Sequence, residues 1–166
     1  MKSIQTRYKG YHFRSRLEAR WAVYFDAIGW EWLYESEGFD LGDGDFYLPD
    51  FYLPECNLWV EVKSEKPDEA EIRKAAKLAA QGPDAVVFAI GLPDAYELSK
   101  GLGGFGGADW GEKEGYTDNL ASLDSYCFSK WRRAGWLLYN TPEYADFDAC
   151  AAARSARFEY GESGAT

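Results

Sequence analysis

The chain has 166 residues, 46% of them hydrophobic, which is enough for the core of one domain, and no apolar run approaches the ~20 residues that cross a bilayer. Its three cysteines are odd in number and far apart, and its start lacks the apolar segment of a secretory signal, so we expect a cytoplasmic protein without a disulfide framework or a zinc site. The net charge of −10 at pH 7, taken alone, argues against nucleic acid as a partner.

The charges are unevenly distributed along the chain. Residues 1–20 hold six Lys or Arg and one acid, whereas residues 21–60 hold nine acids and no Lys or Arg. A basic arm beside an acidic pocket suits a metal-using enzyme that acts on phosphates, because the metal would neutralise the pocket. The alternative is an acidic protein whose basic start has no role. Under the first interpretation, the arm binds phosphates through Arg7, Lys9, Arg14 and Arg16.

A first helix is predicted from Ser15 to the residue before Gly29. Ser15 and Glu18 have the Ser-x-x-Glu spacing of a capping box, in which each side chain bonds to the backbone N–H of the other residue. Gly29 is a typical residue to end a helix. Apolar residues follow at helical intervals inside this segment: Leu17, Trp21, Tyr24 and Ile28.

Strands are predicted over residues 30–36, in two runs joined by a Gly/Asp turn within residues 39–54, and over residues 57–64. Residues 57–64 alternate strictly. Leu58, Val60 and Val62 form one buried face, whereas Trp59, Glu61 and Lys63 share the other.

A second helix is predicted from Pro67 to Ala80, with Gly82-Pro83 ending it, and residues 84–91 form a fully buried strand. The order strand, helix, strand predicts a right-handed parallel crossover and therefore an α/β domain.

The remaining chain is less regular. Residues 92–120, with GLGGFGG at their centre, are interpreted as a flexible surface loop, because a phosphate-binding loop would need a following Gly-Lys-Ser/Thr. Late strands are predicted around residues 127–139, and a last helix from Thr141 to about residue 160. The cations of the late strands either bind phosphates or are only solvated charges: Lys130, Arg132 and Arg133.

Two acids and a lysine on neighbouring strands predict a site for a hard cation. Mg²⁺ prefers one or two carboxylates and leaves room for substrate phosphate oxygens, which Asp50 and Glu61 would allow. Such a metal polarises a phosphate and generates hydroxide from bound water. Lys63 shares a face with Glu61 and would orient the water or offset developing negative charge. The alternative makes Asp50 a turn acid and Glu61–Lys63 a weak surface pair.

These residues match a known sequence motif. Pro49-Asp50, followed by Glu61-Val62-Lys63, resembles the PD-(D/E)XK nuclease superfamily, in the branch of small phage-type, very-short-patch-repair-like and transposase-linked endonucleases. The resemblance covers residues 8–90 or so, including the helix FRSRLEARWAVYF. It implies a restriction-endonuclease-like core, a mixed central sheet flanked by helices. It also implies that Glu18 completes the metal site.

The expected function is that of a Mg²⁺-dependent deoxyribonuclease in a prokaryotic or phage-infected cell, with Mn²⁺ able to substitute and RNA left open as a substrate. Breaking both strands would require a homodimer or two encounters, because one site cuts one strand. The rival interpretation is a non-catalytic nucleic-acid-binding or assembly module. Two further residues have minor candidate roles: His12 as a general base, although a surface residue is favoured, and Glu35 as a reserve metal ligand.

Overall fold

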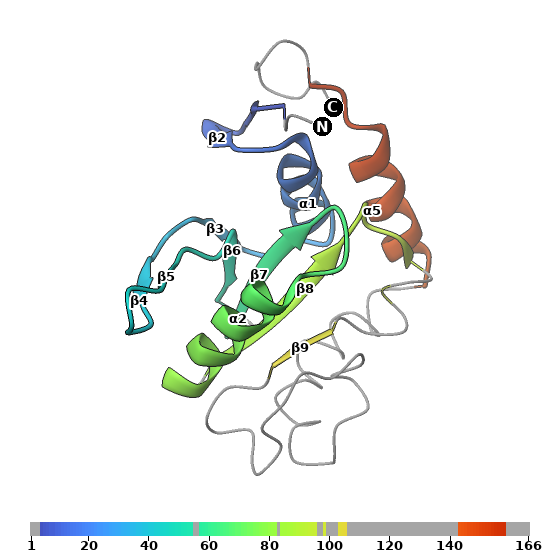
Figure 1. Ribbon diagram of the computed structural model, residues 1–166. Coiled ribbons are helices and arrows are strands. Elements are labelled where there is room, and N and C mark those ends of the chain that lie inside the picture. Colours follow the sequence, from blue (N-terminus) through green and yellow to red (C-terminus); the bar gives the residue numbers. More distant parts are fainter. Residues whose placement is uncertain are drawn as a thin grey trace.

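The computed structural model describes residues 4–54, 57–82, 84–95, 98, 103–105 and 143–158. Within them a five-stranded sheet has the strand order β3-β6-β7-β8-β9 (Figure 1). The pair β7–β8 is parallel and the other neighbours are antiparallel, so the sheet is mixed as expected. Its strands are β3 (Leu33–Tyr34), β6 (Phe51–Leu53), β7 (Leu58–Lys63), β8 (Ala85–Ile90) and β9 (Gly103–Phe105).

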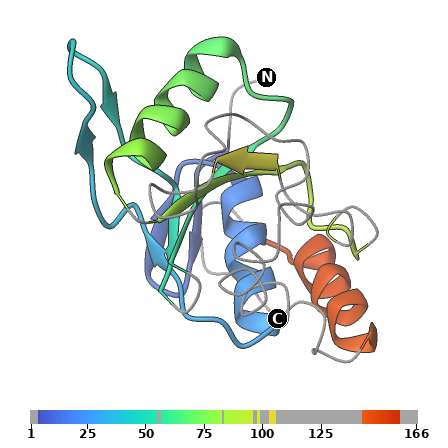
Figure 2. The ribbon, with the colours of Figure 1, turned by 90° about the horizontal axis from the view of Figure 1, so that it is seen from below.

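Helices cover both faces of this sheet. Figure 2 shows α2 on one face and α1 on the other, with α5 beside α1. None of the helices in the described part of the chain is long and apolar enough to cross a membrane. The bounds are α1 (Arg16–Ala27), α2 (Glu69–Gln81) and α5 (Glu143–Ser155).

The alternation predicted for β7 is confirmed. Leu58, Val60 and Val62 belong to the core that packs against α1, whereas Trp59 belongs to the separate core under α2. Glu61 and Lys63 share the α2 face with Trp59, because side chains two residues apart point the same way. The polar end of β7 therefore lies next to the start of α2.

The two first helices are predicted well, with one shift. Ser15 is the N-cap of α1, and Gly29 follows the helix with a φ of 78°. The predicted start of α2 at Pro67 is wrong by two residues: Asp68 is the N-cap and forms a full capping box with Glu71. A side-chain acceptor on Asp68 satisfies a free backbone N–H of the first turn, which proline cannot do.

Two short hairpins lie outside the main sheet. One consists of β1 (Thr6–Tyr8) and β2 (Tyr11–Phe13) in the basic arm. The other consists of β4 (Phe39–Asp40) and β5 (Phe46–Tyr47). Residues 39–54 thus contain three strands rather than the two predicted, because Pro49 separates β5 from β6 and has no N–H to donate to a ladder.

The Gly-rich segment also differs from the prediction. Gly103–Phe105 form β9, which pairs with Val86–Phe88 of β8, so this part is a sheet strand and not a loop. The final helix is confirmed as α5, starting at Glu143. The late strands predicted over 127–139 lie outside the described residues, as does most of 92–120.

Candidate active site

Asp50 lies where two adjacent strands of the sheet meet. It directly precedes β6, and because Phe51 pairs with Val60, the same register places Asp50 level with Glu61. Asp50 is 7% exposed, and its Oδ2 accepts a hydrogen bond from the backbone N–H of Val62 at 2.7 Å. The fully buried Pro49 precedes it. The structure therefore holds a carboxylate inside the protein, directed at β7.

The surroundings of Asp50 disfavour its charged form. Burial, and then the negative charges of Glu61 and Glu18, raise the pKa of Asp50 to about 8. The hydrogen bond from Val62 and the charge of Lys63 act in the opposite direction and are outweighed. The charges of both Glu61 and Glu18 thus act on Asp50.

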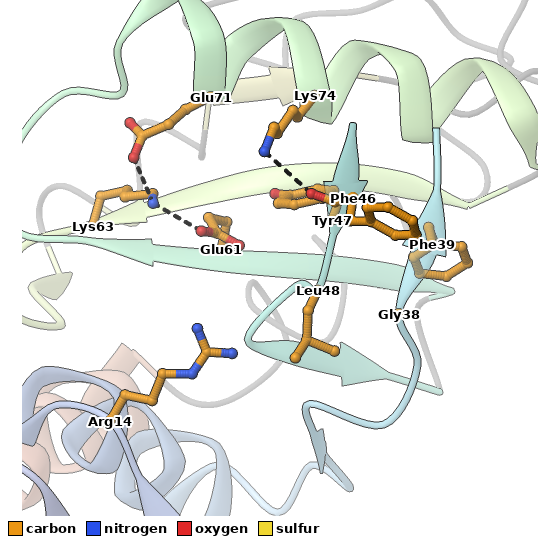
Figure 3. Close-up of a pocket in the computed structure, with 10 residues that line it drawn as sticks. All are labelled: Arg14, Gly38, Phe39, Phe46, Tyr47, Leu48, Glu61, Lys63, Glu71 and Lys74. Carbon is orange, nitrogen blue, oxygen red and sulfur yellow. Dashed lines mark hydrogen bonds and ion pairs between the residues drawn. The ribbon is translucent and has the colours of Figure 1, made fainter. Parts of the chain in front are cut away.

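Glu61 is a second buried acid, 9% exposed, in the middle of the sheet. Its Oε1 accepts from Lys63 Nζ at 2.8 Å (Figure 3). Its Oε2 is buried and has no hydrogen-bond partner among the described residues. The Tyr47 hydroxyl lies beside Glu61, and burial, the charge of Glu61 and the hydrogen-bonding contact with the Glu61 carboxylate raise the Tyr47 pKa. The second oxygen of Glu61 therefore makes no hydrogen bond of good geometry among the described residues, and Tyr47 is the polar neighbour with which a further ligand would share it.

Lys63 lies between two acids. Its ammonium is 2.8 Å from Glu61 and 2.7 Å from Glu71 Oε1, while Glu71 Oε2 accepts from the backbone N–H of Asp68 in the capping box of α2. Burial lowers the pKa of Lys63, but the hydrogen bonds to Glu61 and Glu71 outweigh it and raise the pKa above its ordinary value. The side chain is therefore an ammonium and can donate protons in hydrogen bonds, but cannot accept one.

Glu18 is buried near Asp50 but is engaged by its own neighbours. Its backbone N–H donates to Ser15 Oγ, which confirms half of the predicted capping box. Its carboxylate accepts from the Ser15 hydroxyl and the Tyr34 hydroxyl, each at 2.6 Å, and from the backbone N–H of Arg14 at 3.1 Å. The second capping-box bond thus comes from Arg14, one residue before the predicted donor.

These contacts bear on the predicted metal site. Across the described residues, no group of three or more His, Cys, Asp or Glu side chains is arranged to hold a metal ion. Glu18 accepts hydrogen bonds from Tyr34 and Arg14, and one oxygen of Glu61 pairs with Lys63. Asp50 and the unbound oxygen of Glu61 remain as a pair of carboxylates, which is a ligand set that Mg²⁺ accepts when waters complete its shell.

A groove of about 580 Å³ opens over this site (Figure 3). Glu61 and Lys63 lie along its base, with Arg14 on one side and residues of the β4–β5 hairpin on the other. Glu71 and Lys74 of α2 border it as well. Glu61 is therefore buried yet adjoins a space that is large enough for a segment of a polymer, while its neighbour Asp50 is not among the residues that line the groove.

Three of the four cations in the basic arm have contacts within the described structure. Lys9 pairs with Asp26 at 2.9 Å, Arg14 forms an ion pair with Glu35, and Arg16 donates to the carbonyl of Phe158 at 3.4 Å. Arg7, on β1 opposite His12, is the arm cation without such a contact in the described structure.

The remaining predicted site residues are two minor candidates, His12 and Glu35, and the cations of the late strands. His12 is exposed, as favoured, and Glu35 is occupied by Arg14. Lys130, Arg132 and Arg133 lie outside the described residues.

Sequence reasoning missed three residues that contact the site: Glu71, Tyr34 and Tyr47. Each of them lies on a different helix or strand from Glu61, so its distance along the sequence does not indicate that it contacts the site. Only the capping-box spacing of Asp68 and Glu71 was visible, and it indicates a helix start without placing that start beside Lys63.

Comparisons with protein-family models, with curated proteins and with solved structures found no match.

Proposed function

We propose that this protein is a Mg²⁺-dependent deoxyribonuclease of the PD-(D/E)XK type, with its α/β fold as a restriction-endonuclease-like core. The observation that carries the proposal is the buried pair Asp50 and Glu61 on adjacent strands, with Lys63 on the same face as Glu61. Two buried acids that repel each other are costly for the fold unless one of them keeps a proton or a cation binds between them. The element order helix, strand pair, helix, strand also agrees with the resemblance.

The donor set fits a hard divalent cation. Glu61 Oε2 makes no hydrogen bond of good geometry among the described residues, and burial, followed by the charges of Glu61 and Glu18, raises the pKa of Asp50, a cost that a bound cation would offset. Asp50 and Glu61 would hold Mg²⁺ or Mn²⁺, with Glu18 assisting through its charge on Asp50. When bound, the metal supplies a polarised phosphate and a water of lowered pKa.

Lys63 has a defined part in this mechanism. As an ammonium it donates a hydrogen bond either to the attacking water or to a phosphate oxygen, and its charge stabilises the negative charge that develops on the phosphate. Glu71 holds it from the opposite side, which keeps the ammonium over the groove when Glu61 turns to a metal. Asp50 and Glu61 would bind the metal, whereas Lys63 would orient the attacking water or the phosphate. Replacing an acid should therefore weaken metal binding, and replacing Lys63 should slow cleavage without that loss.

The proposal is tested by incubating the protein with plasmid, linear and branched DNA, with Mg²⁺ and with a chelator. We expect cleavage only with Mg²⁺, and its loss in Glu61→Ala. Glu31→Ala is the matched control, because Glu31 is an exposed glutamate outside the cluster. A folded Glu61→Ala variant that cleaves as well as the wild type would refute the site. A wild type that binds DNA but never cleaves it would favour the non-catalytic module.

A further inference from the structure

The β4–β5 hairpin presents one large apolar side chain next to the candidate site. In β5 the side chains alternate: Tyr47 packs toward the core under α2, together with Phe39, whereas Phe46 points outward and is 68% exposed. Phe39 and Trp59 pack edge to face with ring centroids 5.1 Å apart, which fixes the inner side of the hairpin. Figure 1 shows the hairpin standing beside the sheet.

This hairpin is held against α2 by several polar contacts. Lys77 Nζ lies 2.9 Å from Asp45 Oδ2, and Arg73 Nε lies 3.7 Å from the same oxygen. Lys74 Nζ donates to the backbone carbonyl of Phe46 at 3.2 Å. These contacts hold the backbone of the hairpin against α2 and pair the carboxylate of Asp45 with cations of the helix. Phe46 therefore lies on an anchored hairpin and not on a free loop.

Phe46 and Leu48 border the same groove as Glu61 and Lys63. Leu48 is 37% exposed, so the hairpin side of the groove is apolar, while Lys74 and the Glu35-paired Arg14 are the cations at its margins. An apolar ring beside a phosphate-cutting centre matches the two parts of a nucleotide, a base with a flat face and a charged phosphate. Base–aromatic stacking together with cationic side chains is the usual means of binding single strands.

We propose that Phe46 forms a base-stacking subsite for an unpaired base next to the phosphate that is cut, so that the preferred substrate is single-stranded or frayed DNA. This inference rests on the proposed nuclease function. A base within a duplex has both faces covered by its neighbours, so the ring can stack only on a base that has left the helix. Every base has such a face, so the subsite selects DNA structure rather than sequence.

The test measures binding and cleavage separately. Binding of a labelled single-stranded oligonucleotide and of the matching duplex is followed by fluorescence anisotropy with Ca²⁺ in place of Mg²⁺. Phe46→Ala should weaken single-strand binding by about 5- to 150-fold, the equivalent of one stacked base, with little change for the duplex. Phe46→Trp should restore the affinity. Phe147→Ala is the matched control, because Phe147 is also exposed, at 62%, but lies on α5.

Cleavage with Mg²⁺ then separates the two proposals. If Phe46→Ala binds the single strand as tightly as the wild type, the stacking subsite is wrong, whether or not the protein cuts DNA. If the wild type binds single strands through Phe46 but does not cut them, the subsite stands and the nuclease function fails. Equal loss of affinity in Phe46→Ala and Phe147→Ala would overturn the assignment to the hairpin.

Discussion

Asp50 is the residue whose surroundings are hardest to explain without a ligand. Its burial and the charges of two other carboxylates raise its pKa to about 8, although the hydrogen bond that it accepts from Val62 acts in the opposite direction. A folded protein gains nothing in stability from such a group when it is charged. This cost is what we expect of a residue kept for binding a cation rather than for folding.

The first prediction follows from that pKa. In the metal-free protein the folded state retains the proton of Asp50 while the unfolded state, with an ordinary pKa near ~4, loses it. The free energy of unfolding should therefore fall as pH rises from about 4 to 8, by up to about 1.4 kcal/mol per pH unit from this residue. Asp50→Asn should remove that part of the fall.

Urea unfolding in a chelator at pH 5, 6, 7 and 8 measures the difference between wild type and Asp50→Asn. We expect the variant to be more stable at pH 8 and the two to converge toward pH 5. Parallel curves for the two proteins would show that Asp50 titrates normally.

Lys63 gives the second prediction. Lys63→Ala should lower the cleavage rate about 100- to 1,000-fold, the usual effect of removing one donor that stabilises a transition state. Mn²⁺ affinity should persist, because Glu61 keeps its charge and gains a second free oxygen. Lys66→Ala, at an exposed lysine three residues on, is the control. Loss of Mn²⁺ affinity in Lys63→Ala would mean that Lys63 acts by positioning the acids.

The third prediction concerns Glu18, whose expected role as a metal ligand competes with its role in capping α1. Gln at this position can still accept from the Tyr34 hydroxyl and from Arg14, and it removes a negative charge near Asp50. Glu18→Gln should therefore melt no earlier than the wild type without metal, yet cleave at least about tenfold more slowly. Earlier melting with normal cleavage would make Glu18 a residue of the cap alone.

The residues of the site differ in how far the sequence predicts them. Glu61 and Lys63 follow from strict alternation in a strand, and Asp50 from its place after Pro49 beside that strand. Glu71 and Tyr47 could not be predicted from the sequence. Glu71 contacts Lys63 from α2, and Tyr47 lies beside Glu61 from the β4–β5 hairpin. Their positions depend on packing between elements, for which one sequence carries no signal.

At the scale of elements, the four arm cations are spread over the β1–β2 hairpin, the residue after β2 and the first residue of α1, and most of them already have partners. Lys9 is paired with Asp26 and Arg14 with Glu35, so neither would release a counterion in full on binding DNA. The four predicted phosphate contacts should therefore differ in strength, with the unpaired cation contributing most.

The fourth prediction separates a free cation from a paired one. Arg7→Ala should flatten the slope of log K against log salt by about 0.7 for a single strand, the effect of one lost phosphate contact. Lys9→Ala should change it less, because Asp26 already neutralises Lys9. Salt titrations of DNA binding measure both slopes. Equal effects of the two replacements would show that the intrachain pair does not persist in the complex.

Helices were predicted more securely than strands. α1 and α2 have caps and apolar stripes that repeat over three turns, whereas β3 and β4 are two residues long and offer too few positions for a pattern. β9 could not be recognised, because glycine has a low strand preference and no side chain that alternates. Its pairing with β8 is a contact between distant parts of the chain.

At the scale of the whole molecule, the net charge of −10 does not by itself exclude a polyanionic partner. Several acids are paired inside the protein: Asp26 with Lys9, and Asp45 with Lys77. The acids of the candidate site would be offset by a bound cation. The protein should consequently bind DNA weakly in a chelator and more tightly with a divalent ion.

The central claim is that a cation held by Asp50 and Glu61 enables this chain to cut DNA. It is tested most directly by the initial rate of cleavage of a fluorescent single strand as Mn²⁺ is titrated, for the wild type and Glu61→Gln, which can still accept from Lys63. We predict a saturable rise for the wild type and a midpoint at least about tenfold higher in Mn²⁺ for the variant, because Gln is a neutral and poorer ligand. Superimposable curves, or wild-type cleavage undiminished by a chelator, would contradict the account.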